Sequence, residues 1–156
     1  MEDDRSLLLR AIRIAVEGIA DGGGPFGAVI TRNGNILSEA VNRVVQNSDP
    51  TAHAEVTAIR EAASKLKSHD LKDCILYCSC EPCPMCLGAI YWAGIRKVVY
   101  ACDRNDAANA GFSDRDIYDE IIKKPPDRQI RFLRLENTGG NEVFKKWERY
   151  DNRISY

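Results

Sequence analysis

The sequence has no long hydrophobic run. No stretch approaches the roughly 18 to 20 consecutive apolar residues that a membrane-spanning helix needs. The first residues, Met1-Glu2-Asp3-Asp4-Arg5, are acidic where a secretory signal peptide would be basic. We therefore expect a cytoplasmic protein without a membrane partner.

The sequence also lacks a strong net charge. Its 22 basic and 23 acidic residues give a formal charge of −1, so the total charge does not indicate a polyanionic partner. The distribution is uneven, because the chain from Lys123 onward holds nine basic and five acidic residues. This basic C-terminal segment keeps nucleic acid open as a minor alternative.

The 156 residues, 44% of them hydrophobic, are typical of one folded domain over 1–156, with 151–156 as a tail that lacks periodicity. Apolar spacing of three and four predicts helices, and alternation predicts strands. The expected helices are 7–19, 52–66, 84–93, 113–124 and 142–150, and the expected strands are 26–31, 36–45, 74–80, 97–101 and 130–135. Asn33-Gly34 predicts a hairpin turn between the first two strands, because this pair tolerates the positive φ angles of a tight turn. The fold class is α/β, a three-layer α/β/α sandwich around a mixed five-stranded sheet.

Three glycines, Gly22, Gly24 and Gly27, have the spacing of a dinucleotide-binding fingerprint. That fingerprint requires a preceding strand and a following helix, so that pyrophosphate meets helix N-terminal amides. Here a helix precedes and a strand follows. We interpret the glycines as a sharp turn instead.

His53, Cys83 and Cys86 form a candidate metal site. A catalytic zinc site takes three nitrogen or thiolate ligands and leaves a fourth position open. Cys83 and Cys86 share the first turn of a predicted helix, whose N-terminus stabilises thiolates. We therefore expect one Zn²⁺ per chain, although cobalt or iron could use the same ligands.

Glu55 follows His53 by two residues and is expected not to bind the metal. A neutral histidine and two thiolates offset the charge of Zn²⁺, so the bound water benefits from a nearby base. Glu55 can accept that proton and deliver it to the substrate. A structural zinc module without catalysis is the alternative, but it has no need for such a carboxylate.

The other cysteines allow one competing interpretation. Cys80, Cys83 and Cys86 have the spacing of three iron–sulfur ligands, but the fourth cysteine of that pattern is missing. We expect the remaining thiols to lie in the core or a pocket wall. They are Cys74, Cys78, Cys80 and Cys102.

These motifs resemble the cytidine deaminase-like superfamily of zinc hydrolases, and within it the bacterial guanine deaminases. The similarity is densest between Pro25 and Phe112, including the segments that carry His53-Ala54-Glu55 and Pro82-Cys83-Pro84-Met85-Cys86. The resemblance implies hydrolytic deamination of guanine to xanthine and ammonia in purine salvage or catabolism. Deamination of a tRNA adenosine or of guanosine remains the alternative.

The resemblance also implies roles for other residues. Phe26 and Trp92 would enclose the purine, and Asn42 with the backbone of Ala54 would bind its polar edge. Asp114, as a second catalytic residue, and Tyr156 would interact with the exocyclic amine region. The family resemblance further implies a homodimer that exchanges C-terminal segments, so that Tyr156 acts in the partner's pocket.

Overall fold

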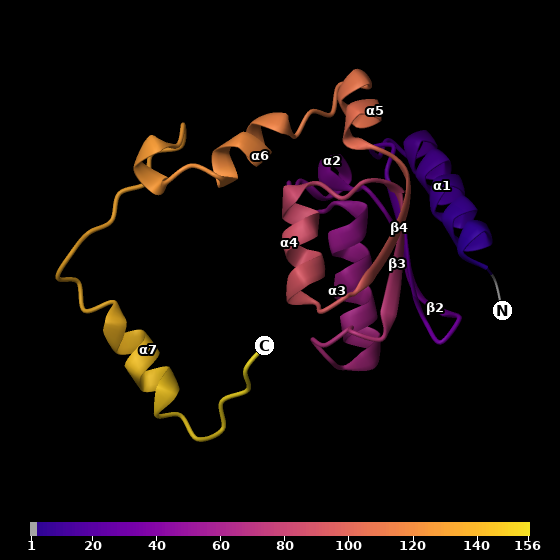
Figure 1. Ribbon diagram of the computed structural model, residues 1–156. Helices are drawn as coiled ribbons and strands as arrows, with labels where there is room; N and C mark the ends of the chain where they lie inside the picture. Colours follow the sequence, from indigo (N-terminus) through magenta and orange to yellow (C-terminus); the bar gives the residue numbers. More distant parts are fainter. Residues whose placement is uncertain (1–2) are drawn as a thin grey trace. The chain divides into compact units, whose positions relative to one another are not determined.

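The computed structural model describes residues 3–156 and divides into two compact units, one that ends at Asp114 and one that spans Arg115–Tyr156 (Figure 1). The first unit holds a four-stranded mixed sheet in the order β2-β1-β3-β4. The bounds of the strands are β1 Gly27–Arg32, β2 Asn35–Val41, β3 Cys74–Cys80 and β4 Lys97–Cys102. β1 pairs antiparallel with β2 and β3, and β3 pairs parallel with β4.

The predicted hairpin is confirmed at the turn between β1 and β2. Asn33 and Gly34 have φ angles of 52° and 77°, the left-handed values that this tight turn requires. The second strand ends at Val41 and not at residue 45. After Asn42 the chain enters a short helix, α2 Val44–Asn47, whose turn cannot continue the ladder of β2.

Helices cover both faces of the sheet, as predicted for a three-layer sandwich (Figure 1). α1 Asp4–Ala20 packs on one face, where Leu7 and Ala11 contact Val29 and Tyr77. α3 Ala54–Leu66 and α4 Pro84–Trp92 cover the other face. Gly27 allows α1 to pack closely, because a Cβ there would lie 2.3 Å from the Ala11 carbonyl oxygen.

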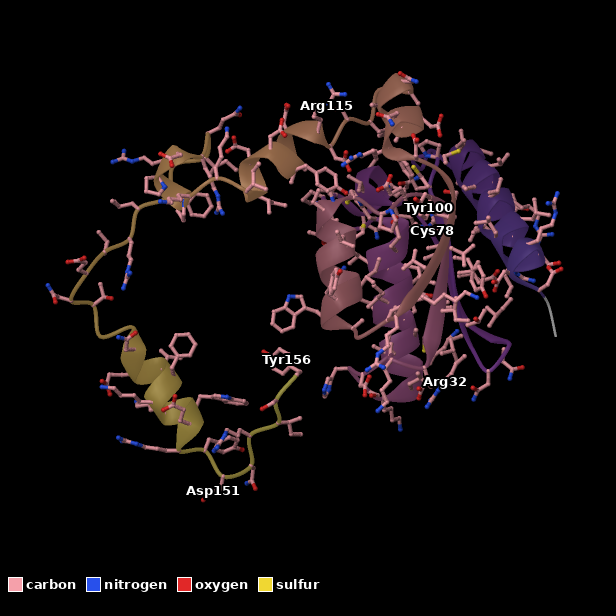
Figure 2. The ribbon with its side chains drawn as sticks, in the orientation of Figure 1. Arg32, Cys78, Tyr100, Arg115, Asp151 and Tyr156 are labelled. Carbon is pink, nitrogen blue, oxygen red and sulfur yellow. The ribbon has the colours of Figure 1, made fainter. Side chains whose placement is uncertain are left out.

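β4 lies at one edge of the sheet. Its residues Tyr100 and Cys102 pair in register with Cys78 and Cys80 of β3, and Figure 2 shows Cys78 and Tyr100 side by side. Cys102 is exposed and, with Cys80, lines a pocket, so it takes the pocket-wall position, one of the two places predicted for these thiols. The cysteines of β3 are buried as predicted.

After β4, α5 Arg104–Asn109 completes the first unit. The second unit contains α6 Arg115–Ile121, a 3₁₀ turn at Pro125–Asp127 and α7 Asn141–Glu148. α6 is shorter than the helix predicted over 113–124, whereas α7 agrees closely with the predicted 142–150. None of these three elements buries a residue.

The fifth strand predicted at 130–135 is wrong for this chain taken alone. These residues have no regular secondary structure, and the sheet of the described residues has four strands. Alternating apolar residues become a strand only when a neighbouring strand pairs with their backbone N–H and C=O groups. Among residues 3–156, no helix is long and apolar enough to cross a membrane.

Candidate active site

His53, Cys83 and Cys86 come together as the sequence predicts. His53 Nδ1 lies 3.5 Å from each thiol sulfur, and the two sulfurs lie 3.5 Å apart. A tetrahedral Zn²⁺ with bonds of about 2.3 Å to sulfur and about 2.1 Å to nitrogen places its ligand atoms roughly 3.6 Å apart. The triangle of ligand atoms therefore has the size that Zn²⁺ requires.

Two helix starts hold these ligands. His53 precedes the first residue of α3, and Cys83 precedes the first residue of α4, where Pro84 supplies a backbone angle suited to a first helical position. Cys86 lies in the first turn of α4 and is fully buried. Both helix N-termini direct positive potential and amide donors toward the cluster, which stabilises thiolates.

The electrostatics of the three ligands also fit a cation. The Cys86 thiol beside Cys83, together with His53, lowers the pKa of Cys83. The pKa of Cys86 is raised, first by its hydrogen bond with Cys83 and second by its burial. Without a cation, two thiolates 3.5 Å apart repel each other. A divalent metal ion removes this conflict, so the donor set fits Zn²⁺.

Glu55 lies beside the ligand cluster, in the first turn of α3. Its side chain is only 5% exposed, and its Oε2 atom lies 3.5 Å from the Cys86 sulfur. Burial raises the pKa of this carboxyl group. A buried carboxylate next to a three-ligand metal site is suited to carry a proton between water and a substrate.

Asn42 lies between the glycine-rich turn and α2, and its side chain is buried, 8% exposed. Its backbone N–H donates to the Phe26 carbonyl oxygen at 3.0 Å. The Val44 N–H donates to its side-chain oxygen Oδ1 at 3.3 Å. Because Oδ1 accepts from the backbone, the NH₂ group is the part of the amide that remains to donate to a ligand.

Ala54 belongs to a buried core cluster against which Phe26 packs. Ala54 is fully buried and is the first residue of α3, between His53 and Glu55. Phe26 precedes β1, and its ring makes an edge-to-face contact with Phe112 at a centroid distance of 5.1 Å. This geometry is a favourable arrangement for two aromatic rings.

Asp114, the last residue of the first unit, is half-buried. Burial raises the pKa of its carboxyl group, and the negative charge of Cys83 raises it further. The Cys83 charge acts on Asp114 only because the two side chains lie within electrostatic range of each other. Asp114 therefore belongs to the surroundings of the ligand cluster.

Residues 1–102 match the family described as the cytidine and deoxycytidylate deaminase zinc-binding region. The chain belongs to this family of zinc-binding deaminases. A related protein, guanine deaminase of Bacillus subtilis (strain 168), is 51% identical over 152 residues, 97% of each chain. The X-ray structure of guanine deaminase from Bacillus subtilis has a TM-score of 0.97 and 50% identity, and 99% of both chains is covered.

Two further relatives of the deaminase are more distant. A protein solved in complex with 8-azaguanine is 32% identical, with a TM-score of 0.69 and coverage of 90% of this chain and 72% of that chain. The tRNA-specific adenosine deaminase of Aquifex aeolicus is 43% identical over 91 residues, which are 58% of this chain and 60% of the relative. The similarity over nearly the whole deaminase is therefore to a guanine deaminase.

Trp92 is not brought to the ligand cluster of the deaminase. It is the last residue of α4 and 70% exposed, about 9 Å further along the helix axis than Cys86. Tyr156 belongs to the second unit, where it is exposed, and its role stays a prediction. The sequence did not indicate a role for Phe112. Its contact with Phe26 joins two distant segments, and no spacing of apolar residues predicts such a contact.

Proposed function

We propose that this deaminase hydrolyses guanine to xanthine and ammonia, with one Zn²⁺ held by His53, Cys83 and Cys86. One observation carries the proposal: a buried Glu55 carboxylate lies beside three metal ligands in a chain 51% identical over 97% of its length to a guanine deaminase. Held by these three ligands, Zn²⁺ would supply Lewis acidity, which lowers the pKa of water and so makes hydroxide available as the nucleophile for an electrophilic ring carbon.

Glu55 carries protons through the reaction. Its carboxylate accepts one proton from the attacking water as the oxygen bonds to C2 of guanine. It then protonates N3 of the ring, and a second proton from the same water goes to the amino group, which leaves as ammonia. Guanine and water are thereby converted to xanthine and ammonia. Burial suits Glu55 to this role, because it keeps bulk water from competing for the proton.

The surrounding residues support recognition of a purine. The NH₂ group of Asn42 is the donor that remains for a carbonyl oxygen of the base, since its own oxygen accepts the Val44 N–H. The Ala54 N–H is one of the amides that the start of α3 leaves without an intrahelical partner. The ring of Phe26 would pack against the planar base, and Asp114 would interact with the exocyclic amine.

The substrate assignment has a direct test. The zinc-loaded protein is incubated separately with guanine, guanosine, adenine, cytosine and unmodified tRNA, while ultraviolet absorbance and ammonia release are measured. Conversion of guanine alone is expected. Turnover of tRNA that weakens steeply with salt would instead favour the tRNA alternative, which the basic residues after Lys123 motivate.

We also infer that two copies exchange their C-terminal units. Within the second unit, large apolar side chains stay exposed that a stable protein normally buries. They are Ile117, Ile121, Ile122, Ile130, Phe132, Leu133, Leu135, Val143, Phe144, Trp147, Tyr150, Ile154 and Tyr156. α7 gathers several of them at helical spacing, and 130–135 alternates as a strand does.

The first unit offers matching surfaces. The outer side of β4 is a sheet edge, and an edge strand presents unpaired backbone groups that a strand from another chain can bind. α1 exposes a second apolar stripe that includes Val16 and Ile19. Exchange would pair the edge of β4 and bury the exposed apolar side chains of the second unit. It would also bring Tyr156 of one copy to the active site of the other.

Co-expression of two inactive variants tests the exchange. Glu55→Gln removes the proton carrier but keeps the tail, and Tyr156→Ala removes the terminal ring but keeps Glu55. If Tyr156 acts in the partner's pocket, mixed dimers regain one complete site, about a quarter of all sites for random pairing. Activity no higher than that of the Tyr156→Ala protein alone would contradict exchange, as would a monomer in light scattering.

A further inference from the structure

The glycine-rich turn before β1 packs directly on the side chain of Asn42. A Cβ atom built on Gly24 would lie 3.1 Å from both the Cγ and the Oδ1 atoms of Asn42, and 3.4 Å from its Cβ. The two distances of 3.1 Å are shorter than ordinary van der Waals contacts. The φ angle of Gly24 lies outside the left-handed region, so alanine fits the backbone there and only space is lacking.

The amide of Asn42 has little freedom to move away from such an atom. The Val44 N–H holds its oxygen, and its backbone N–H is bound to the Phe26 carbonyl oxygen. The Phe26 N–H in turn donates to the Gly24 carbonyl oxygen at 2.8 Å. The turn and Asn42 therefore form one connected unit, in which the missing side chain of Gly24 leaves the space for the amide.

We propose that Gly24 is a positioning residue, which sets the orientation in which Asn42 donates to the substrate. This inference rests on the proposed function, in which Asn42 binds a carbonyl oxygen of guanine. An added methyl group must displace the amide by a few tenths of an ångström. Hydrogen bonds weaken as their geometry departs from linear, so the substrate is bound less tightly while the ligands and Glu55 stay in place.

Two other glycines, Gly23 and Gly88, have different surroundings from Gly24. A Cβ on Gly23 would meet backbone oxygens, at 2.5 Å from that of Asn42 and 2.9 Å from that of Gly18. Gly23→Ala is therefore expected to lower stability. A Cβ on Gly88, within α4, meets nothing within 4 Å, so Gly88→Ala is the matched control.

A double-mutant cycle tests the proposal. Gly24→Ala, Asn42→Ala and the double variant are compared for KM and kcat with guanine and for binding of 8-azaguanine, alongside Gly88→Ala. Loss of one well-aligned hydrogen bond predicts a rise in KM and Kd of about three- to tenfold for Gly24→Ala, with kcat nearly unchanged. In the Asn42→Ala background, Gly24→Ala is expected to have no further effect.

An equal effect of Gly24→Ala in both backgrounds would overturn the proposal, as would the absence of any effect on KM and Kd. If Gly24→Ala alone does not fold, the inference requires Asn42→Ala to restore folding, and a double variant that stays unfolded overturns it. A wild-type protein that neither turns over guanine nor binds 8-azaguanine refutes the proposed function and this inference with it. Normal wild-type turnover with additive effects refutes the inference alone.

Discussion

Glu55→Gln separates catalysis from folding at this site. Glutamine has the shape of glutamate, so the buried position beside Cys86 stays filled. The amide cannot accept and return a proton as the carboxylate does. The substitution therefore leaves the three ligand atoms of His53, Cys83 and Cys86 in place while it removes the proton carrier.

The expected loss can be estimated from the position of the carboxylate. A positioned general base contributes about 10²- to 10⁴-fold to the rate, which corresponds to roughly 3 to 5.5 kcal/mol of activation free energy. Glu55 lies 3.5 Å from a ligand sulfur and is screened from solvent, which places the expected loss in kcat toward the upper end of this range.

Glu55→Gln is expected to lower kcat without lowering the stability of the fold. The fold keeps the Glu55 side chain 5% exposed, and a buried charge is costly where no cation balances it. In the zinc-free protein, the neutral amide avoids that cost, so the thermal midpoint of Glu55→Gln is expected to equal or exceed that of the wild type. A residue that only maintained the structure would not combine lower activity with higher stability.

The assay combines three measurements: guanine turnover by ultraviolet absorbance, zinc content by elemental analysis and thermal unfolding of the zinc-free protein. Glu17→Gln is the control, since Glu17 is an exposed surface residue of α1. A Glu55→Gln protein that binds one zinc per chain and keeps kcat within about tenfold of the wild type would refute the role of Glu55. Loss of zinc would show that the carboxylate maintains the metal site instead.

Three further perturbations test the fold and the site. Arg10 donates a hydrogen bond to Glu39 and lowers the pKa of the Glu39 carboxyl group. The pair therefore stabilises the fold at pH values above the usual pKa of glutamate, and this contribution is lost as the pH falls through the lowered pKa. Arg10→Ala should therefore lower stability at pH 7, by on the order of 1 kcal/mol or less, and by a smaller amount at about pH 2, where more of the Glu39 carboxyl group is protonated. An equal difference at both pH values would contradict this. Gly27→Ala forces a Cβ against the backbone of α1 and should cost about 3 kcal/mol in denaturant unfolding, whereas a loss under about 0.5 kcal/mol would mean that α1 shifts freely. Cys83→Ser should reduce zinc content well below one per chain while Cys80→Ser keeps it, and equal zinc in both variants would remove Cys83 from the ligand set.

The sequence predicted those elements whose signals are local. The apolar stripe of α1, the Asn33-Gly34 turn and the strand Cys74–Cys80 depend on neighbouring residues, and each was confirmed. The approach of His53 to Cys83 was also predictable, although 30 residues separate them. A histidine and two cysteines at the starts of predicted helices form a donor set that is typical of a single zinc ion.

The features that could not be predicted depend on distant packing. Residues 130–135 alternate as a strand, but alternation does not say which edge they pair with or in which copy. Trp92 is conspicuous as an aromatic residue, yet the length of α4 places it far from the metal ligands of its own chain. The contact between Gly24 and Asn42 joins two turns, and only the folded backbone brings them together.

If two copies exchange their C-terminal units as proposed, the edge of β4 makes the stability of the protein depend on its concentration. Where a sheet edge is completed by a second chain, the folded state gains stability by mass action, and the melting temperature rises with total protein. A dilute activity assay and a concentrated unfolding experiment then observe different populations of the same enzyme. Under the proposed exchange, a newly synthesised chain would also have to meet a second copy before its exposed edge pairs with an unrelated strand and aggregates.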